Sequence, residues 1–166
     1  MNDNEHSVYL LLGSNLSDRI ATIKTATALI TDQIGELKTA SRYYESQAWG
    51  KTDQPDFVNQ ALEVRTKLTP QEVLNTILQI EKDMGRTRTE KWAERTIDID
   101  ILMYDNLVMN LPDLIIPHLH LHERNFALIP LMEIAGETEH PLLHKTIEDI
   151  YFDCSDPLEV ILMDEK

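Results

Sequence analysis

The sequence predicts an α+β domain, because segments with strand and helix periodicity follow one another in the order strand, helix, strand, strand, helix, strand. A chain of 166 residues is long enough to bury a sizeable core, so we expect a single domain over residues 1–166. The order is that of a ferredoxin-like βαββαβ sandwich, in which helices pack on an antiparallel sheet. We expect further short elements on the C-terminal side.

The first strand and the first helix differ in their apolar spacing. Residues 7–12 form an apolar run that predicts a strand ending at Gly13. Residues 18–33 carry apolar side chains at near-helical spacing, with Asn15 or Ser17 as the expected N-cap. Gly35 is the expected helix stop.

Two more strands and a second helix follow. Residues 38–44 predict the second strand, and residues 57–66 predict the third from their alternation of apolar and polar side chains. Thr69 before Pro70 is typical of a helix start, and the apolar spacing carries this helix to about Met84.

The C-terminal half contains shorter segments. A polar stretch, 86–94, precedes a strand of β-branched and aliphatic residues that includes 98–104. A short return strand is expected at 107–109, and short helices are expected at 126–134 and 147–151.

Composition narrows the function classes. The chain has 29 acidic and 15 basic residues, a formal charge of -14, which argues against binding nucleic acid over a large surface. Its apolar runs are shorter than the roughly 18 residues of a membrane span, and its first residues lack the basic region of a signal peptide. The single Cys154 fits a reducing cytoplasm. We expect a cytoplasmic monomer.

Two aspartates lie two positions apart in the predicted buried strand. Asp98 and Asp100 therefore share one face of the sheet, and the isoleucines between and around them share the other. Two adjacent carboxylates repel each other and are costly to bury without a positive partner. A hard cation such as Mg²⁺, carrying phosphate oxygens, is the natural partner.

Basic residues gather just before this pair. Arg86, Arg88 and Arg95 lie within ten positions, with Lys82 and Lys91 nearby. A solvated charged loop is one interpretation. The other is metal-dependent phosphoryl transfer, in which arginines stabilise the negative charge of phosphates. Because the chain lacks a P-loop and any G-x-G-x-x-G motif, arginines and metal ions would have to hold a nucleotide.

Three histidines follow at alternate positions, His118, His120 and His122. A zinc site is one interpretation, although acidic or cysteine ligands for it are not identifiable. The favoured interpretation is that one histidine contacts phosphate and the other two are exposed.

Aromatic residues in or near polar segments could clamp a flat heterocycle or simply pack in the core. They are Trp49, Phe57, Trp92 and Phe126. Asn59 shares a strand face with Phe57, and its amide offers both a donor and an acceptor. Asn59 could therefore match the edge of a pyrimidinone ring.

Five motifs together resemble one family. The segment 91–102, K-W-A-E-R-T-I-D-I-D-I-L, is similar to the signature of the 6-hydroxymethyl-7,8-dihydropterin pyrophosphokinase (HPPK) family of folate biosynthesis. The segments 13–15, 53–61, 81–88 and 117–131 resemble further family motifs in consistent order. The resemblance covers about residues 7–155, the expected core of the domain.

The resemblance implies transfer of pyrophosphate from ATP to the hydroxymethyl group of the pterin, giving AMP and the pterin diphosphate. It implies that Asp98 and Asp100 hold two Mg²⁺ ions and that Arg86 and Arg95 are also catalytic. The implied ATP contacts are Glu81, Arg86, Arg88, Trp92, Arg95, Ile101, His118 and Arg124. The implied pterin contacts are Ser46, Ala48, Phe57, Asn59 and Phe126.

The chain departs from the family pattern at the pterin side. Residues 46–49, S-Q-A-W, stand where members often have T-P-P-L, and Phe57 stands where tyrosine is common. Two other interpretations are open: a binding module that has lost catalysis, and a Mg²⁺-dependent transferase for another heterocycle. Formation of AMP from ATP with this pterin and Mg²⁺ separates all three.

Overall fold

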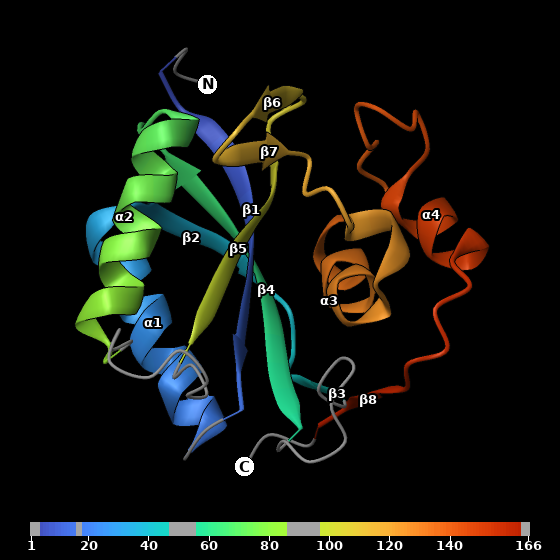
Figure 1. Ribbon diagram of the computed structural model, residues 1–166, viewed down its shortest axis with the longest axis horizontal. Coiled ribbons are helices and arrows are strands. Elements are labelled where there is room, and N and C mark those ends of the chain that lie inside the picture. Colours follow the sequence, from blue (N-terminus) through green and yellow to red (C-terminus); the bar gives the residue numbers. More distant parts are fainter. Residues whose placement is uncertain (1–3, 16–17, 47–55, 86–96, 164–166) are drawn as a thin grey trace.

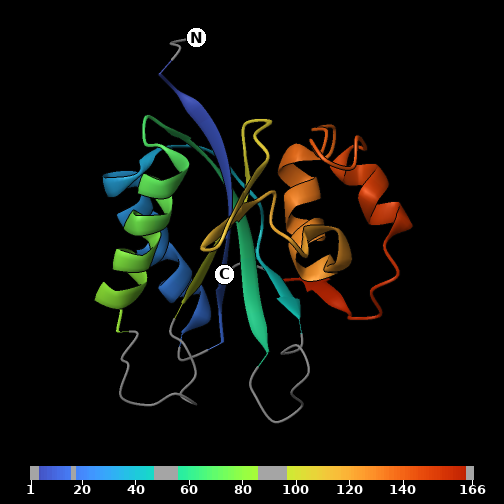
Figure 2. The ribbon, with the colours of Figure 1, turned by 45° about the horizontal axis from the view of Figure 1, so that its top comes forward.

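The computed structural model describes residues 4–15, 18–46, 56–85 and 97–163. A twisted sheet forms the middle layer, with α1 (Arg19–Gln33) and α2 (Pro70–Asp83) on one face (Figure 1). The opposite face carries α3 (Asn125–Ala135) and α4 (Ile147–Asp153), as a second view confirms (Figure 2). The predicted α+β class with an antiparallel sheet is confirmed.

The central strands pair in the order of a ferredoxin-like sheet. β1 (His6–Ser14) lies between β5 (Asp98–Tyr104) and β4 (Phe57–Thr66), and both pairings are antiparallel. The other edge of β4 pairs with β2 (Gly35–Ala40) along one half and with β3 (Tyr44–Ser46) along the other. The strands predicted at 57–66 and 98–104 are confirmed.

The sheet separates two cores. Alternate residues of β1, β4 and β5 face α1 and α2, and the buried members include Leu10, Leu62 and Ile99. The residues between them face α3, where Leu11 packs with Leu128 and other side chains of that helix. Burial of apolar surface at about 25 cal/mol per Å² makes both cores strongly stabilising.

Side chains cap the N-termini of α1 and α2. The Asp18 side chain accepts from the N–H of Ala21 at 3.1 Å, so the expected caps at Asn15 and Ser17 are wrong by one to three positions. In α2 the predicted Thr69 cap is confirmed, and Glu72 completes a capping box with it.

The second strand differs from the prediction. The sequence predicts one strand at 38–44, but the chain forms β2 and β3 with a break at Ser41. The Ser41 hydroxyl accepts from the N–H of Ala61 at 2.9 Å, so a side chain takes over one backbone position of the ladder. The helix ends directly before Gly35, as predicted, with Ile34 as its C-cap, and Gly35 itself begins β2.

The C-terminal elements are partly as expected. The return strand lies at β6 (Met109–Leu111), two residues later than predicted, and pairs with β7 (Leu114–Ile116). Both C-terminal helices are confirmed. The 3₁₀ turn η1 (Leu121–Glu123) and β8 (Val160–Leu162), which pairs with β3, have no counterpart among the predicted elements.

None of the helices in the described ranges combines the length and apolar character needed to cross a membrane.

The backbone of β4 approaches Gly35 so closely that a side chain has no room there. A Cβ at Gly35 would lie 1.9 Å from the carbonyl oxygen of Arg65 on β4. We expect Gly35→Ala to lower the free energy of unfolding in urea by about 2–3 kcal/mol, as overpacking does. The exposed Lys38 on the same strand serves as the control, since Lys38→Ala should change it by less than about 0.5 kcal/mol. Equal values for the two variants would contradict this explanation.

We expect His140 to make stability depend on pH. It is buried in the connection between α3 and α4, and its Nδ1 accepts from the N–H groups of Leu142 and Leu143. Burial lowers the pKa of His140, and nearby His122 and His144 lower this pKa further. The unfolded chain therefore binds this proton more readily, and stability should fall as pH drops below about 6.5.

The measurement is urea unfolding at neutral and mildly acidic pH. His140→Gln keeps a side-chain acceptor but cannot titrate, so we expect a smaller loss of stability on acidification than in the unsubstituted protein. An identical loss in the two proteins would rule out His140 as the source.

Candidate active site

The two aspartates lie on the edge strand β5, on the sheet face that α3 partly covers. Asp98 stands opposite Gly13 of β1, and Asp100 stands opposite Leu11. Both aspartates are half-buried, whereas Ile97 and Ile99 are buried on the other face. The alternation expected from the sequence therefore holds.

Glu81 supports this strand from α2. Its side chain is buried, and its Oε2 accepts from the backbone N–H of Ile99 at 2.9 Å. Because Ile99 lies between the two aspartates, this hydrogen bond fixes the backbone that carries both of them. Local sequence patterns do not reveal this contact, since Glu81 and Ile99 are 18 positions apart.

A cavity of about 360 Å³ opens beside β5, between α2 and the β6–β7 hairpin. Asp100 and His118 contribute polar groups to it, and Asp113 lies at the hairpin turn. Most of its remaining wall is apolar, formed by Leu74, Ile99, Ile101, Pro112, Leu114, Ile115 and Leu119. The cavity can hold a flat, largely apolar ring with polar groups directed at Asp100 and His118.

His118 has a lowered pKa, which favours its neutral form. Burial lowers its pKa, Asp100 opposes this, and Arg124 and His120 lower the pKa further. Its Nδ1 accepts from the N–H of His120 at 3.2 Å, which leaves the proton on Nε2. His118 can therefore donate one hydrogen bond to an anion in the cavity.

The other two histidines turn towards Glu123. His120 lies 3.5 Å and His122 lies 3.3 Å from its carboxylate, and both are partly exposed. Within the described ranges, no group of three or more His, Cys, Asp or Glu side chains could hold a metal ion, so the zinc interpretation finds no support there.

A second polar group lies on the same sheet face. Asn59 of β4 is buried, and its Nδ2 donates to the Ser46 hydroxyl at 3.4 Å. Phe57 stands opposite Ser46 on the neighbouring strand and is partly exposed. Phe126, at the start of α3, carries the guanidinium of Arg124 at 5.6 Å from its ring centre. The region thus offers two aromatic rings and one amide edge.

Strand register brings the two polar groups together. Asp98, Gly13 and Asn59 stand opposite one another on β5, β1 and β4, so they form a row across the sheet. Neighbouring strands are about 4.8 Å apart, which places Asp98 and Asn59 roughly 10 Å from each other at the backbone. Gly13 carries no side chain between them, and a Cβ there would lie 2.6 Å from Oδ1 of Asn59.

Several expected site residues lie outside the described residues. They are Ala48, Arg86, Arg88, Trp92 and Arg95. Six of the described members lie in two groups. Asp100, Ile101 and His118 line the cavity, while Ser46, Phe57 and Asn59 gather at the amide edge. Sequence reasoning placed Gly13 in a motif but missed its spacing role, which only strand register reveals.

The sequence is similar to those of known proteins. The family model for 7,8-dihydro-6-hydroxymethylpterin-pyrophosphokinase (HPPK) matches residues 9–136. A protein of Aquifex aeolicus named 2-amino-4-hydroxy-6-hydroxymethyldihydropteridine pyrophosphokinase is 41% identical over 143 residues, which cover 86% of this chain and 89% of that protein. A protein of the same name from Haemophilus influenzae is 38% identical, covering 81% of this chain and 85% of its own.

A solved structure shares the fold. The crystal structure of wild-type Plasmodium falciparum HPPK-DHPS superposes with a TM-score of 0.74 over 90% of this chain, at 17% identity. This chain spans 44% of that longer one. The family model and the two bacterial relatives cover most of the present sequence, and together they fix its family. The chain belongs to the 7,8-dihydro-6-hydroxymethylpterin-pyrophosphokinase family.

Proposed function

We propose that this chain transfers pyrophosphate from ATP to the hydroxymethyl group of 6-hydroxymethyl-7,8-dihydropterin, giving AMP and the pterin diphosphate. Family membership supports the reaction. The observation that supports the site is the row of Asp98, Gly13 and Asn59, in which a carboxylate and an amide share one sheet face and the residue between them has no side chain. Two substrates bound at its ends would meet over Gly13, and such positioning supplies much of the rate of phosphoryl transfer.

The amide edge suits the pterin. A pterin ring is flat and has donors and acceptors on one edge, which matches the mixed hydrogen bonding of an Asn side chain. Ser46 holds the Asn59 amide, and Phe57 and Phe126 supply faces for stacking. We propose that Ala48, outside the described residues, also contributes to this pocket.

The cavity suits the nucleotide. Its apolar wall, including Ile101, would take the base, while His118 donates from Nε2 to a phosphate oxygen. Arg124 adds positive charge at the boundary with Phe126. In this assignment Glu81 acts through Ile99, as support for the aspartates. We propose phosphate contacts for Arg86 and Arg95 as well, both acting on the transition state, and ATP contacts for Arg88 and Trp92.

The aspartates fit magnesium. Two carboxylates on one strand face are hard oxygen donors, and Mg²⁺ commonly takes one or two carboxylates with water and phosphate oxygens as the other ligands. We propose that Asp98 and Asp100 hold two such ions. When bound, Mg²⁺ neutralises the charge on the phosphate oxygens. The contribution of this chain is to hold both carboxylates at a fixed spacing, through the β1–β5 ladder and Glu81.

The deciding experiment measures AMP from ATP, Mg²⁺ and 6-hydroxymethyl-7,8-dihydropterin. AMP formed only when the pterin is present supports the proposal, and its absence would favour a binding module. We also propose that the protein acts as a cytoplasmic monomer, which sedimentation of the full chain and cell fractionation would test.

Removing either carboxylate should abolish most of the activity. We expect Asp98→Asn and Asp100→Asn each to lower kcat by about 100-fold or more, the loss of roughly 3 kcal/mol of charge stabilisation. Asp105 follows β5 at its far end, so Asp105→Asn makes the same charge change away from the site and should keep near-normal kcat. Near-normal turnover in either of the first two variants would contradict the metal assignment.

Filling the space at Gly13 should affect the pterin alone. Gly13→Ala places a Cβ within 2.6 Å of Oδ1 of Asn59, so the amide must move. We expect the Kd of the pterin to rise by about tenfold or more, because displacement of a positioning group by about 1 Å is costly. Titration of pterin and of an ATP analogue separates the effects. Unchanged pterin binding, with Asn59→Ala impaired, would show that Gly13 has no spacing role.

A further inference from the structure

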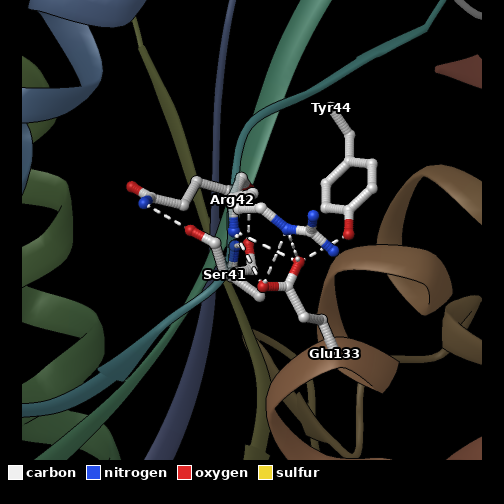
Figure 3. A network of polar contacts seen from close by, with 6 residues as sticks. Ser41, Arg42, Tyr44 and Glu133 are labelled. Carbon is white, nitrogen blue, oxygen red and sulfur yellow. Dashed lines mark hydrogen bonds and ion pairs between the residues drawn. The ribbon is translucent and has the colours of Figure 1, made fainter. Parts of the chain in front are cut away.

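A polar network joins α3 to the edge of the sheet that carries β3 (Figure 3). The Glu133 carboxylate of α3 accepts from the hydroxyl of Tyr44 at 2.5 Å. It also accepts from the backbone N–H of Arg42 at 3.2 and 3.3 Å, and from Nε of Arg42 at 3.4 Å. One carboxylate therefore fixes the chain just before β3 and the first residue of β3.

The bond from Tyr44 is the shortest of these contacts. Tyr44 is 7% exposed, and burial, followed by Glu133, raises its pKa to about 12. The phenol therefore stays protonated at physiological pH and donates to the Glu133 carboxylate. Hydrogen bonds of this charge-assisted kind are roughly twice as strong as neutral ones.

The network continues into the centre of the sheet. Ser41 precedes Arg42, and its hydroxyl accepts from the N–H of Ala61 on β4. Gln60, also on β4, donates from Nε2 to the carbonyl of Ser41 at 2.7 Å. The segment that Glu133 holds is thus itself attached to β4, the strand that carries Asn59.

Residue spacing connects this network with the proposed pterin pocket. Tyr44 stands directly opposite Asn59, and Tyr44 and Ser46 share a face of β3. On α3, Phe126 and Glu133 are seven positions apart, which is about two turns, so they lie on the same side of the helix. The bond between Tyr44 and Glu133 therefore joins the strand face with the amide to the helix side with the aromatic ring.

The other contacts of α3 do not fix its position on the sheet as sharply. Ala127, Leu128 and Leu131 pack in the apolar core, and apolar packing has no preferred direction. The sequence of α3 has two polar side chains, Asn125 and Glu133, and Asn125 bonds to Asp156 in the C-terminal segment. In the part of the chain that is described, Glu133 is the polar side chain through which α3 reaches the sheet.

We propose that Glu133 is a positioning residue for the pterin pocket. By holding Tyr44, it sets the distance and rotation of Phe126 relative to Asn59, and so sets the affinity for the pterin without touching it. The inference rests on the proposed function, because it takes the space between Phe126 and Asn59 as the pterin site.

The test compares the binding of two ligands, the pterin substrate and an ATP analogue. In Glu133→Ala and in Tyr44→Phe, we expect weaker pterin binding, with Kd and KM raised about tenfold in the first variant and less in the second, as misplacement by a fraction of 1 Å would cause. Binding of the ATP analogue should change less than about twofold. Glu133→Gln keeps an acceptor for Tyr44, so it should give an intermediate pterin Kd.

Arg42→Ala is the matched control. It removes the guanidinium, which is 63% exposed, but keeps the backbone N–H that donates to Glu133. Its pterin Kd should stay within about twofold of the unsubstituted protein, since exposed ion pairs contribute little.

Two results would overturn the inference. One is unchanged pterin binding in folded Tyr44→Phe and Glu133→Ala, and the other is equal weakening of both ligands, which indicates general loosening. If Glu133→Ala does not fold, the result for Tyr44→Phe decides the question. That variant removes only the hydroxyl oxygen that donates to Glu133, so we expect it to fold. AMP formation by the unsubstituted protein is measured alongside, so failure of the proposed function is seen separately.

Discussion

The register of β1 between β4 and β5 is the constraint on which the site depends. Antiparallel pairing sets Gly13 opposite both Asn59 and Asp98, and the same pairing sets Leu11 opposite Asp100. A slip of one residue in either ladder would turn the polar side chains into the core of α1 and α2. The register is held because Leu10 and Leu12, on the other face of β1, are fully buried.

The two faces of the sheet differ in burial and in polarity. The face under α1 and α2 is sealed by the larger of the two apolar cores. The face under α3 is only partly covered, and the half-buried Asp98 and Asp100 lie there with Asn59. Stability and chemistry are thus kept apart by the two-residue period of the strands, which is why a carboxylate pair can sit within a well-packed strand.

Local patterns predict the parts of the fold that local physics decides. The Thr69-Pro70 helix start, the alternation in 57–66 and the shared face of Asp98 and Asp100 follow from neighbouring residues, and each can be read from the sequence. β8 could not be predicted, because three residues form a strand there only by pairing with β3 more than one hundred positions away. The break at Ser41 depends on a hydrogen bond from the N–H of Ala61, on the neighbouring strand, to the Ser41 hydroxyl. The strand propensity of the residues around Ser41 does not reveal this bond.

Local sequence patterns also predict only part of the candidate site. The resemblance pointed to Asn59 and Phe126 as site residues, but neither their spacing nor its cause is local. The strand side is set by backbone hydrogen bonds, which recur at every second residue and resist sliding. The helix side has no such ladder, and its apolar contacts are non-directional. A directional bond is therefore needed where the helix meets the sheet, and Glu133 supplies it.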